Sequence, residues 1–373
     1  MSKVLLIASF APSLVNFRGP LIRALVGLGH EVHVAAPGVR AIIAASELAS
    51  IVTAHDTPVD RTGTGLMANL REIAVYRQLI RRIRPAHVLC YTIKPVVLGT
   101  LAARLERVPH RTALLTGLGY VFESASLRAR MIRLAISPLY RAALGGAEMV
   151  IFQNPDDEAT LRRLRLVAPA QRSIVVSGSG IDLERFLPVP LAEGRVVLLI
   201  ARLVKAKGIL DFVAAARIVR SRDPRIVFRL AGWFDDANPV AISRSEVAEW
   251  VREGTIEYLG ALEDVRPALA ACTVFCLPSY YEGTPRTVLE ALATGRPIVT
   301  TDVPGCRETV RDGWNGYLVP PHDPAGLADA ILKLLGDRAE TERMADASLS
   351  YARDRYDVNK VNADMVEGMG LAA

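Results

Sequence analysis

Two glutamates separated by seven residues lie in a segment whose other residues favour anion binding. Glu282 precedes and Glu290 follows a Gly-Thr-Pro-Arg run, and an apolar stretch ends shortly before it at Leu277. Gly283 would let a ligand approach the backbone, and Pro285 suits a first helical turn because its missing N–H costs nothing there. The amides of that turn would bind an anion, with one carboxylate at each end of the ligand. The alternative is a capped helix with two solvated glutamates.

A second segment with suitable chemistry joins an apolar run at residues 196–200 to a helical pattern. Its residues Arg202 and Lys207 would project from the end of a strand towards the same ligand. Arginine offers a planar fork of donors for phosphate, and lysine offers a mobile point charge. Taken alone, the segment is also compatible with a solvated basic loop.

Two loops in the first half place glycine where a strand would pass into a helix. Arg18 and Gly19 form the first of these loops, and Thr116, Gly117 and Gly119 belong to the second. The first position suits an anion, and the second would line the same cleft; the alternative for these glycines is simple turn chemistry. Neither loop has the dinucleotide-binding pattern Gly-x-Gly-x-x-Gly.

Short β-branched runs alternate with helical patterns, which predicts parallel sheets with helices on both faces. In the first half we expect strands at residues 3–9, 31–36, 50–54, 87–91, 112–116 and 149–153, and helices that include 19–28, 66–83 and 127–144. In the second half we expect strands at 196–200, 226–231, 256–259, 273–277 and 298–300. The predicted fold class is therefore α/β, with two tandem Rossmann-like domains facing a cleft where the carboxyl ends of the strands meet helix N-termini.

The domain boundaries follow from the composition between the two series of strands. Residues 184–194 contain Pro188, Pro190 and Gly194 and show no strong period, which is typical of a linker. We expect a first domain over residues 1–185, a linker over 186–194 and a second domain over 195–354. The final segment, about 355–373, is expected to form a helix that packs back on the first domain.

The composition excludes several classes of protein. Hydrophobic residues make up 51% and charged residues 23% of the 373 residues, a globular balance that excludes disordered and collagen-like chains. The four cysteines form no Cys-x-x-Cys pair and no metal-binding spacing, which is typical of a reducing compartment. The apolar start is short and broken by Pro12, so it predicts a buried strand and not a signal peptide. No run approaches the ~18 apolar residues of a membrane span.

The net charge of +6 is unevenly distributed. Residues 1–185 hold 23 Lys and Arg against 13 Asp and Glu, a net +10, and the remainder holds 22 against 26, a net −4. A basic first half favours contact with nucleic acid, a phosphorylated substrate or a membrane surface. The predicted helix 127–144 interleaves arginines with apolar residues, although Pro138 is expected to kink or split it. Such a helix can lie on an anionic bilayer; the alternative is a packed helix with solvated arginines.

Together these segments resemble the retaining glycosyltransferases of family 4, which have the GT-B fold, and the resemblance covers nearly the whole chain. Glu282 and Glu290 reproduce the family's E-x7-E motif, and Arg202 and Lys207 match its form R-L-x-x-x-K-G. Residues 177–186 and 312–316 are similar to its N-G-V-D-x-x-x-F and D-G-x-N-G motifs.

The resemblance implies a role for each residue type. The second domain would bind a nucleotide-diphosphate sugar, and in particular a UDP-sugar. Arg202 and Lys207 would hold the diphosphate and stabilise its charge as it departs. Glu282 would contact the donor sugar, and Glu290 the ribose hydroxyls. The other donor-binding residues would be Gly232, Gly283, Thr284, Pro285 and Arg286. In the first domain, the residues facing the acceptor would be Arg18, Gly19, Lys94, Thr116, Gly117 and Gly119.

Four segments of the first half are similar to bacterial members that build glycans on polyprenyl diphosphate carriers: residues 16–20, 92–95, 116–122 and 153–157. This implies hexosyl or N-acetylhexosaminyl transfer to a lipid-linked saccharide in surface polysaccharide or glycan synthesis. The implied location is cytoplasmic and peripheral, on the inner face of the cytoplasmic membrane. Many family members carry a histidine where this chain has Thr116 and Gly117, so a role resting on that histidine does not carry over.

Two other functions remain open at this point. A UDP-sugar 2-epimerase of the same fold would need acid and base groups near the donor sugar, and the first-domain loops offer little carboxylate beyond Glu123. A non-enzymatic nucleotide-binding protein would use the basic first half. A nucleic-acid partner is not expected, because the chain has no basic stripe studded with aromatic residues for stacking on bases.

The reaction is expected to need no metal or other cofactor. The sequence has no Asp-x-Asp element suited to a metal ion, and fixed cations would take the place of Mg²⁺. By the family precedent, the anomeric configuration would be retained by front-face attack without a protein nucleophile.

Overall fold

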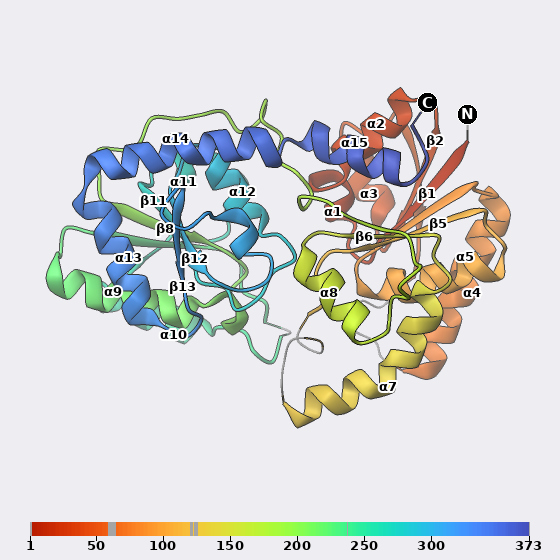
Figure 1. The fold of residues 1–373 in the computed structure, drawn as a ribbon, viewed down its shortest axis with the longest axis horizontal. Helices are drawn as coiled ribbons and strands as arrows, with labels where there is room; N and C mark the ends of the chain where they lie inside the picture. Colours follow the sequence, from red (N-terminus) through yellow and green to blue (C-terminus); the bar gives the residue numbers. More distant parts are fainter. Residues whose placement is uncertain (1, 59–64, 120–121, 123–125, 237, 373) are drawn as a thin grey trace. The chain divides into compact units, whose positions relative to one another are not determined.

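The computed structural model describes residues 2–58, 65–119, 122, 126–236 and 238–372. The chain divides into two compact units (Figure 1), of which unit 1 is Met1–Ser179 with Asn359–Ala373 and unit 2 is Gly180–Val358. Residues 186–194, expected to form a linker, lie within unit 2, and the residues from Asn359 onward belong to unit 1. Among the described residues, no helix is long and apolar enough to cross a membrane.

Unit 1 is built on a seven-stranded parallel sheet with the order β3-β2-β1-β4-β5-β6-β7. Its strands are β1 (Lys3–Ile7), β2 (Glu31–Ala36), β3 (Val52–Asp56), β4 (His87–Tyr91), β5 (His110–Leu115), β6 (Met149–Phe152) and β7 (Ser173–Val175). The central strands β1 and β4 are buried and apolar after their first residue, because both faces of a parallel sheet are covered. The six predicted strands of this half are confirmed to within two residues at each end, and β7 has no predicted counterpart.

Helices cover both faces of this sheet (Figure 1). They are α1 (Pro12–Asn16), α2 (Gly19–Gly27), α3 (Val39–Ala44), α4 (Leu66–Ile83), the π-helical turn η1 (Pro95–Gly99), α5 (Thr100–Leu105), α7 (Leu127–Leu144), α8 (Pro155–Arg163) and α15 (Val358–Gly368). Buried residues of α2, α3 and α15 pack with those of β1 and β2 in one cluster. Helix α7 is continuous through Pro138, so the expected split of this helix does not occur.

Unit 2 has a six-stranded parallel sheet with the order β10-β9-β8-β11-β12-β13. Its strands are β8 (Val196–Ile200), β9 (Val227–Ala231), β10 (Glu257–Tyr258), β11 (Val274–Leu277), β12 (Ile298–Thr301) and β13 (Gly316–Val319). Its helices are η2 (Lys205–Lys207), α9 (Ile209–Arg222), α10 (Arg244–Arg252), α11 (Arg266–Ala270), α12 (Arg286–Ala293), η3 (Arg307–Thr309), α13 (Pro324–Gly336) and α14 (Arg338–Arg355). The five predicted strands are confirmed, and β13 has no predicted counterpart.

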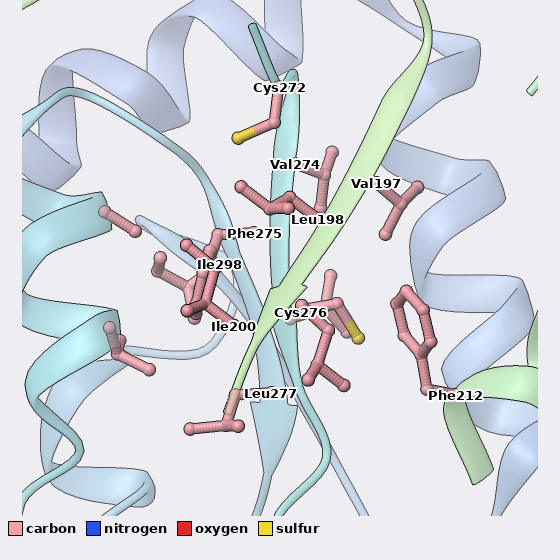
Figure 2. Close-up of a cluster of buried hydrophobic side chains, with 14 of the residues drawn as sticks. Val197, Leu198, Ile200, Phe212, Cys272, Val274, Phe275, Cys276, Leu277 and Ile298 are labelled. Carbon is pink, nitrogen blue, oxygen red and sulfur yellow. The ribbon is translucent and has the colours of Figure 1, made fainter. Parts of the chain in front are cut away.

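The core of unit 2 surrounds its central strands. Figure 2 shows Val197 of β8, Phe275 of β11 and Phe212 of α9 among buried side chains. Burying one such side chain typically stabilises a fold by about 1.5–3 kcal/mol. This core therefore holds the central strands, and the loops that follow them, in place. The same cluster includes Cys272 and Cys276, which are free, and burial raises the pKa of the Cys272 thiol to about 12. The predicted α/β class with two Rossmann-like units is confirmed.

Candidate functional site

The basic segment after β8 is fixed at the carboxyl edge of the unit 2 sheet. Arg202 lies two residues beyond β8, and Lys207 ends the 3-10 turn η2 that leads into α9. The Leu203 N–H donates to the Trp233 carbonyl at 3.1 Å, and Leu203 forms a β-bridge with Phe234. The loop after β9 therefore runs beside the basic segment and supports its backbone.

Both basic side chains of this segment form ion pairs with carboxylates of unit 2. Arg202 Nη1 lies 3.1 Å from Asp235 Oδ2, and the Lys207 ammonium pairs with Glu282 in the loop after β11. Arg202 and Asp235 are partly exposed, so water screens this pair and its net stabilisation is small. An anionic ligand can therefore replace Asp235 at little cost, whereas the Lys207–Glu282 pair is largely covered. Asp235 was not among the predicted residues, because its pairing depends on the course of the loop after β9.

The loop after β11 packs directly on η2. The Tyr280 N–H donates to the Ala206 carbonyl at 2.9 Å. A Cβ at Gly208 would lie 1.8 Å from the Pro278 carbonyl oxygen, and Gly208 has a φ of 68°, so only glycine permits this approach. The two segments that the sequence singled out for chemistry are thus brought together, as predicted.

Helix α12 begins directly after Pro285, its N-cap residue, which agrees with a helix start at this proline. Glu290 lies in the second turn and is buried, and Arg286 Nε donates to its Oε1 at 3.1 Å. Burial raises the pKa of Glu290, and the charge of Arg286 opposes this rise. Because Glu290 is buried and Glu282 is mostly covered, the alternative of two solvated glutamates is wrong.

Glycines allow other close approaches at the same sheet edge. A Cβ at Gly232, directly after β9, would lie 1.8 Å from the Ala201 carbonyl oxygen. A Cβ at Gly305, which has a φ of 76°, would lie 2.2 Å from the Glu282 carbonyl oxygen. The Glu282 loop is therefore held by the loop after β12 as well. Sequence reasoning named Gly232 but missed Gly305, since an isolated glycine beside a proline also fits an ordinary turn.

The residues between the two glutamates that were predicted to bind the donor occupy a short connection. Thr284 Oγ donates to the Gly283 carbonyl at 2.9 Å, and Pro285 then opens α12. These three residues lie between the loop that pairs with Lys207 and the helix that carries Glu290. A ligand bound against this connection would have a carboxylate on each side of it.

In unit 1, the predicted residues follow strands that are neighbours in the sheet. Ser9 Oγ and Thr92 Oγ1 lie 2.8 Å apart, which joins the loops after β1 and β4. A Cβ at Gly119 would lie 3.7 Å from Ile93 Cδ1, so the loop after β5 is also adjacent. This third loop begins with Thr116 and Gly117, whereas Tyr120, Val121 and Glu123 lie outside the described residues.

Two cationic residues of unit 1 make interior contacts that the sequence did not predict. Lys94 Nζ donates to Glu72 Oε2 at 2.9 Å, and this pair is largely buried. Arg18 is buried, with Nη1 3.9 Å from the Met365 sulfur of α15, and Gly19 begins α2. The roles of these residues in acceptor binding stay predictions.

Two motifs from the sequence analysis stabilise turns. Asn315 Oδ1 accepts from the Arg311 N–H at 2.8 Å, and Asp312 Oδ1 accepts from the Leu318 N–H at 2.9 Å, which shapes the turn into β13. Asn154 Oδ1 caps α8 by accepting from the Asp157 N–H at 2.8 Å. These residues have a structural explanation that requires no ligand.

Comparisons with known proteins agree with this geometry. A family described as "Glycosyl transferase 4-like" matches residues 3–154, and "Glycosyl transferases group 1" matches residues 194–337. The chain is 28% identical over 339 residues to N,N'-diacetylbacillosaminyl-diphospho-undecaprenol alpha-1,3-N-acetylgalactosaminyltransferase of Campylobacter jejuni, covering 87% of each chain. It is 25% identical to UDP-Gal:alpha-D-GlcNAc-diphosphoundecaprenol alpha-1,3-galactosyltransferase of Escherichia coli, covering 77% of this chain and 76% of the relative.

Solved structures share the fold over the whole chain. Sucrose-phosphate synthase from Thermosynechococcus elongatus has a TM-score of 0.83 at 21% identity and covers 98% of each chain. Anabaena HepE, solved with UDP and glucose, has a TM-score of 0.76 at 18% identity and covers 100% of each chain. The two sheets, the glutamate and basic motifs and both family matches lead to one conclusion. The chain belongs to the group 1, family 4 glycosyltransferases and has the GT-B fold.

Proposed function

We propose that the protein transfers a sugar from a UDP-sugar to a saccharide carried on polyprenyl diphosphate. The observation that carries this proposal is that unit 2 brings Arg202 and Lys207 to the same sheet edge as Glu282 and Glu290. Relatives whose names specify transfer to undecaprenol-diphosphate-linked sugars support the choice of acceptor. Surface polysaccharide or glycan synthesis is the process in which such a product would be used.

Donor binding would exchange protein carboxylates for the diphosphate. Arg202 would leave Asp235, and Lys207 would leave Glu282, and both cations would contact phosphate oxygens. Glu282 would then be available to accept hydrogen bonds from hydroxyls of the donor sugar, while Glu290 would accept them from the ribose. The cations are held by the protein before the reaction, so they stabilise the charge that develops on the leaving diphosphate.

The transfer step needs no protein nucleophile in this proposal. The acceptor hydroxyl oxygen forms a bond to the anomeric carbon as the bond from that carbon to the phosphate oxygen breaks. UDP leaves with the bonding electrons and takes the hydroxyl proton on a phosphate oxygen. Because attack and departure occur on the same face, the anomeric configuration is retained.

The acceptor would bind in unit 1, and α7 would contact the membrane. Leu127, Met131 and Leu134 are spaced as i, i+4 and i+7, so they share one side of α7, and they are 75%, 68% and 77% exposed. Exposed arginines, including Arg128 and Arg130, lie on the same helix. An exposed apolar stripe beside arginines suits the surface of an anionic bilayer, which here is the inner face of the cytoplasmic membrane.

Thermal unfolding against a panel of UDP-, GDP- and dTDP-sugars tests the donor. A donor at about 100 times its Kd should stabilise the fold by ~2.7 kcal/mol, and only the UDP-sugars are expected to do so. The panel also separates hexoses from N-acetylhexosamines. Transfer from the stabilising donor to a synthetic polyprenyl-diphosphate-linked sugar then tests the reaction. Conversion of the donor to its 2-epimer without an acceptor would instead establish the epimerase.

A further inference from the structure

Unit 1 contains a cavity of about 250 Å³ that the proposed roles do not use. It lies between α4, η1 and α7, and most of its wall is apolar. The apolar part of the wall includes Val97, Leu118, Phe122, Ile136 and Leu139. Leu139 and Ile93, which also lines the cavity, are partly exposed, so the cavity opens to the surface beside them. The volume equals that of about eight molecules of liquid water.

One end of the cavity is polar. Lys94 lines it and pairs with Glu72, whose other oxygen accepts a hydrogen bond from Tyr76 at 3.1 Å. Asn69 also lines it, and Asn69 Oδ1 is buried without a hydrogen-bond partner among the described residues. A buried polar atom left unpaired is costly, and a half-turn of this amide would present its NH₂ group to a ligand instead. The cavity thus combines one polar end, which holds the Lys94–Glu72 ion pair and the Asn69 amide, with an apolar wall.

The backbone around Lys94 departs from regular structure. Thr92 has a φ of 68°, which is unfavourable for a β-branched residue, and Pro95–Gly99 forms a π-helical turn. Both features occur preferentially at functional sites, where the rest of the fold compensates their cost. Here they place Lys94 and Val97 in the wall of one cavity, which favours a binding role for this wall over a purely structural one.

We propose that this cavity binds the isoprenoid chain of the carrier lipid next to its diphosphate. The proposal rests on the proposed function for the identity of the acceptor. Lys94 could donate to phosphate oxygens in place of Glu72, the amide of Asn69 could donate to them as well, and the apolar wall complements hydrocarbon. A sugar would need many more polar partners than this wall offers, because specific sugar sites pair most hydroxyls.

Helix α7 connects the cavity to the exposed stripe of this helix. Ile136 and Leu139 line the cavity, whereas Met131 and Leu134 are exposed on another side of the helix. One helix therefore borders both the proposed chain site and the proposed membrane contact. A chain that leaves the cavity beside Leu139 would therefore emerge at the helix that carries the exposed stripe.

Titration calorimetry with the full chain tests the cavity directly. Farnesyl diphosphate and inorganic diphosphate serve as probes, with saturating UDP present to fill the donor site. The wild type should bind farnesyl diphosphate at least tenfold more tightly than inorganic diphosphate. Ile136→Phe fills the cavity and should remove this advantage, and Leu139→Phe at the cavity edge provides a second variant if the first does not fold. Leu105→Phe, the same enlargement at an exposed leucine of α5, should bind both probes within twofold of the wild type.

Two results would overturn the cavity proposal: equal affinity of the wild type for both probes, or equal losses in Ile136→Phe and Leu105→Phe. A transfer assay separates this proposal from the proposed function. Undiminished transfer to a polyprenyl-linked acceptor by folded Ile136→Phe would refute the cavity and leave the function standing. Chain-dependent binding without transfer of any sugar from a nucleotide donor would refute the function and leave the cavity standing.

Discussion

Three cations at the carboxyl edge of the unit 2 sheet each face a carboxylate. The pairs are Arg202 with Asp235, Lys207 with Glu282, and Arg286 with Glu290. The first pair is partly exposed, so exchanging Asp235 for phosphate costs little. The other two pairs are largely covered, and removing one partner from a buried pair is far more costly. The structure thus separates one readily exchanged ion pair from two that are held more firmly.

Arg202→Ala and Lys207→Ala should each lower kcat by ~10²–10³, because each removes one fixed donor to the departing diphosphate. Steady-state transfer kinetics on protein with an unchanged melting temperature measures the effect. Arg222→Ala is the matched control, since Arg222 forms an exposed ion pair with Asp329 on α13. Turnover close to that of the wild type in either site variant would remove that residue from the mechanism.

Glu290→Gln should raise the donor KM with little change in kcat. The amide keeps the size of the side chain, but it cannot accept hydrogen bonds from two ribose hydroxyls as a carboxylate can. The ribose is remote from the reacting carbon, so the loss affects ground state and transition state equally. Initial rates at varied donor concentration and saturating acceptor give kcat and the donor KM separately. A kcat reduced by orders of magnitude at constant donor KM would contradict the ribose assignment.

Transfer should persist in EDTA. In the described part of the chain, no group of three or more His, Cys, Asp or Glu side chains could hold a metal ion, and two cations already face the site. Initial rates with and without EDTA, and after addition of Mg²⁺ or Mn²⁺, measure the dependence. Activity that disappears in EDTA and returns with a divalent ion would show that Arg202 and Lys207 do not suffice.

At the scale of elements, the strands that position the site were predictable, and two edge strands were not. β8 and β11 are buried in the centre of their sheet, so their sequences are continuously apolar and easily recognised. β7 has three residues and is half-exposed, and β13 begins with a glycine. Neither strand is apolar along its whole length or shows a clear alternation, and the pairing of each is dictated by the neighbouring strand.

The candidate site residues could be recognised from their spacing in the sequence, whereas the residues that form ion pairs with them could not. Glu282 and Glu290 lie in one loop and the helix that follows it, so their spacing in the sequence predicts that they are close in space. Asp235 pairs with Arg202 across 33 positions, and Glu72 pairs with Lys94 across 22. Such pairings depend on the path of each loop across the sheet edge, and a local sequence pattern does not predict that path.

Gly208→Ala should weaken donor binding and destabilise unit 2 more than Gly254→Ala does. Both glycines have positive φ, 68° and 69°, so alanine costs about 1–2 kcal/mol at either position. Only at Gly208 would the new Cβ also lie 1.8 Å from the Pro278 carbonyl oxygen, while Gly254 has no atom within 4 Å. Thermal unfolding and donor titration of both variants separate the two effects. If both variants lost the same stability and the same donor affinity, the close approach of Gly208 to Pro278 would not be what positions Lys207.

At the scale of the molecule, the charge is divided between the parts of the chain. Residues 1–185 carry a net charge of +10, and the rest carries −4. A substrate with a diphosphate and a membrane tail would meet the basic part, since long-range attraction of this kind raises association rates. In the described part of unit 1, exposed arginines and exposed apolar side chains occur together on α4, α5 and α7, and α7 carries the largest number of exposed apolar side chains.

The protein should therefore float with phosphatidylglycerol liposomes at low salt and less at high salt. Each Lys or Arg near an anionic surface contributes ~1 kcal/mol, and salt screens that attraction. Charging the stripe with Met131→Glu and Leu134→Glu should abolish flotation, because it removes apolar burial and adds repulsion. Val251→Glu is the control, an equivalent change at an exposed valine of α10 in unit 2. If the wild type stayed off both anionic and neutral liposomes at low salt, α7 would not be a membrane contact and the acceptor would have to reach the enzyme in solution.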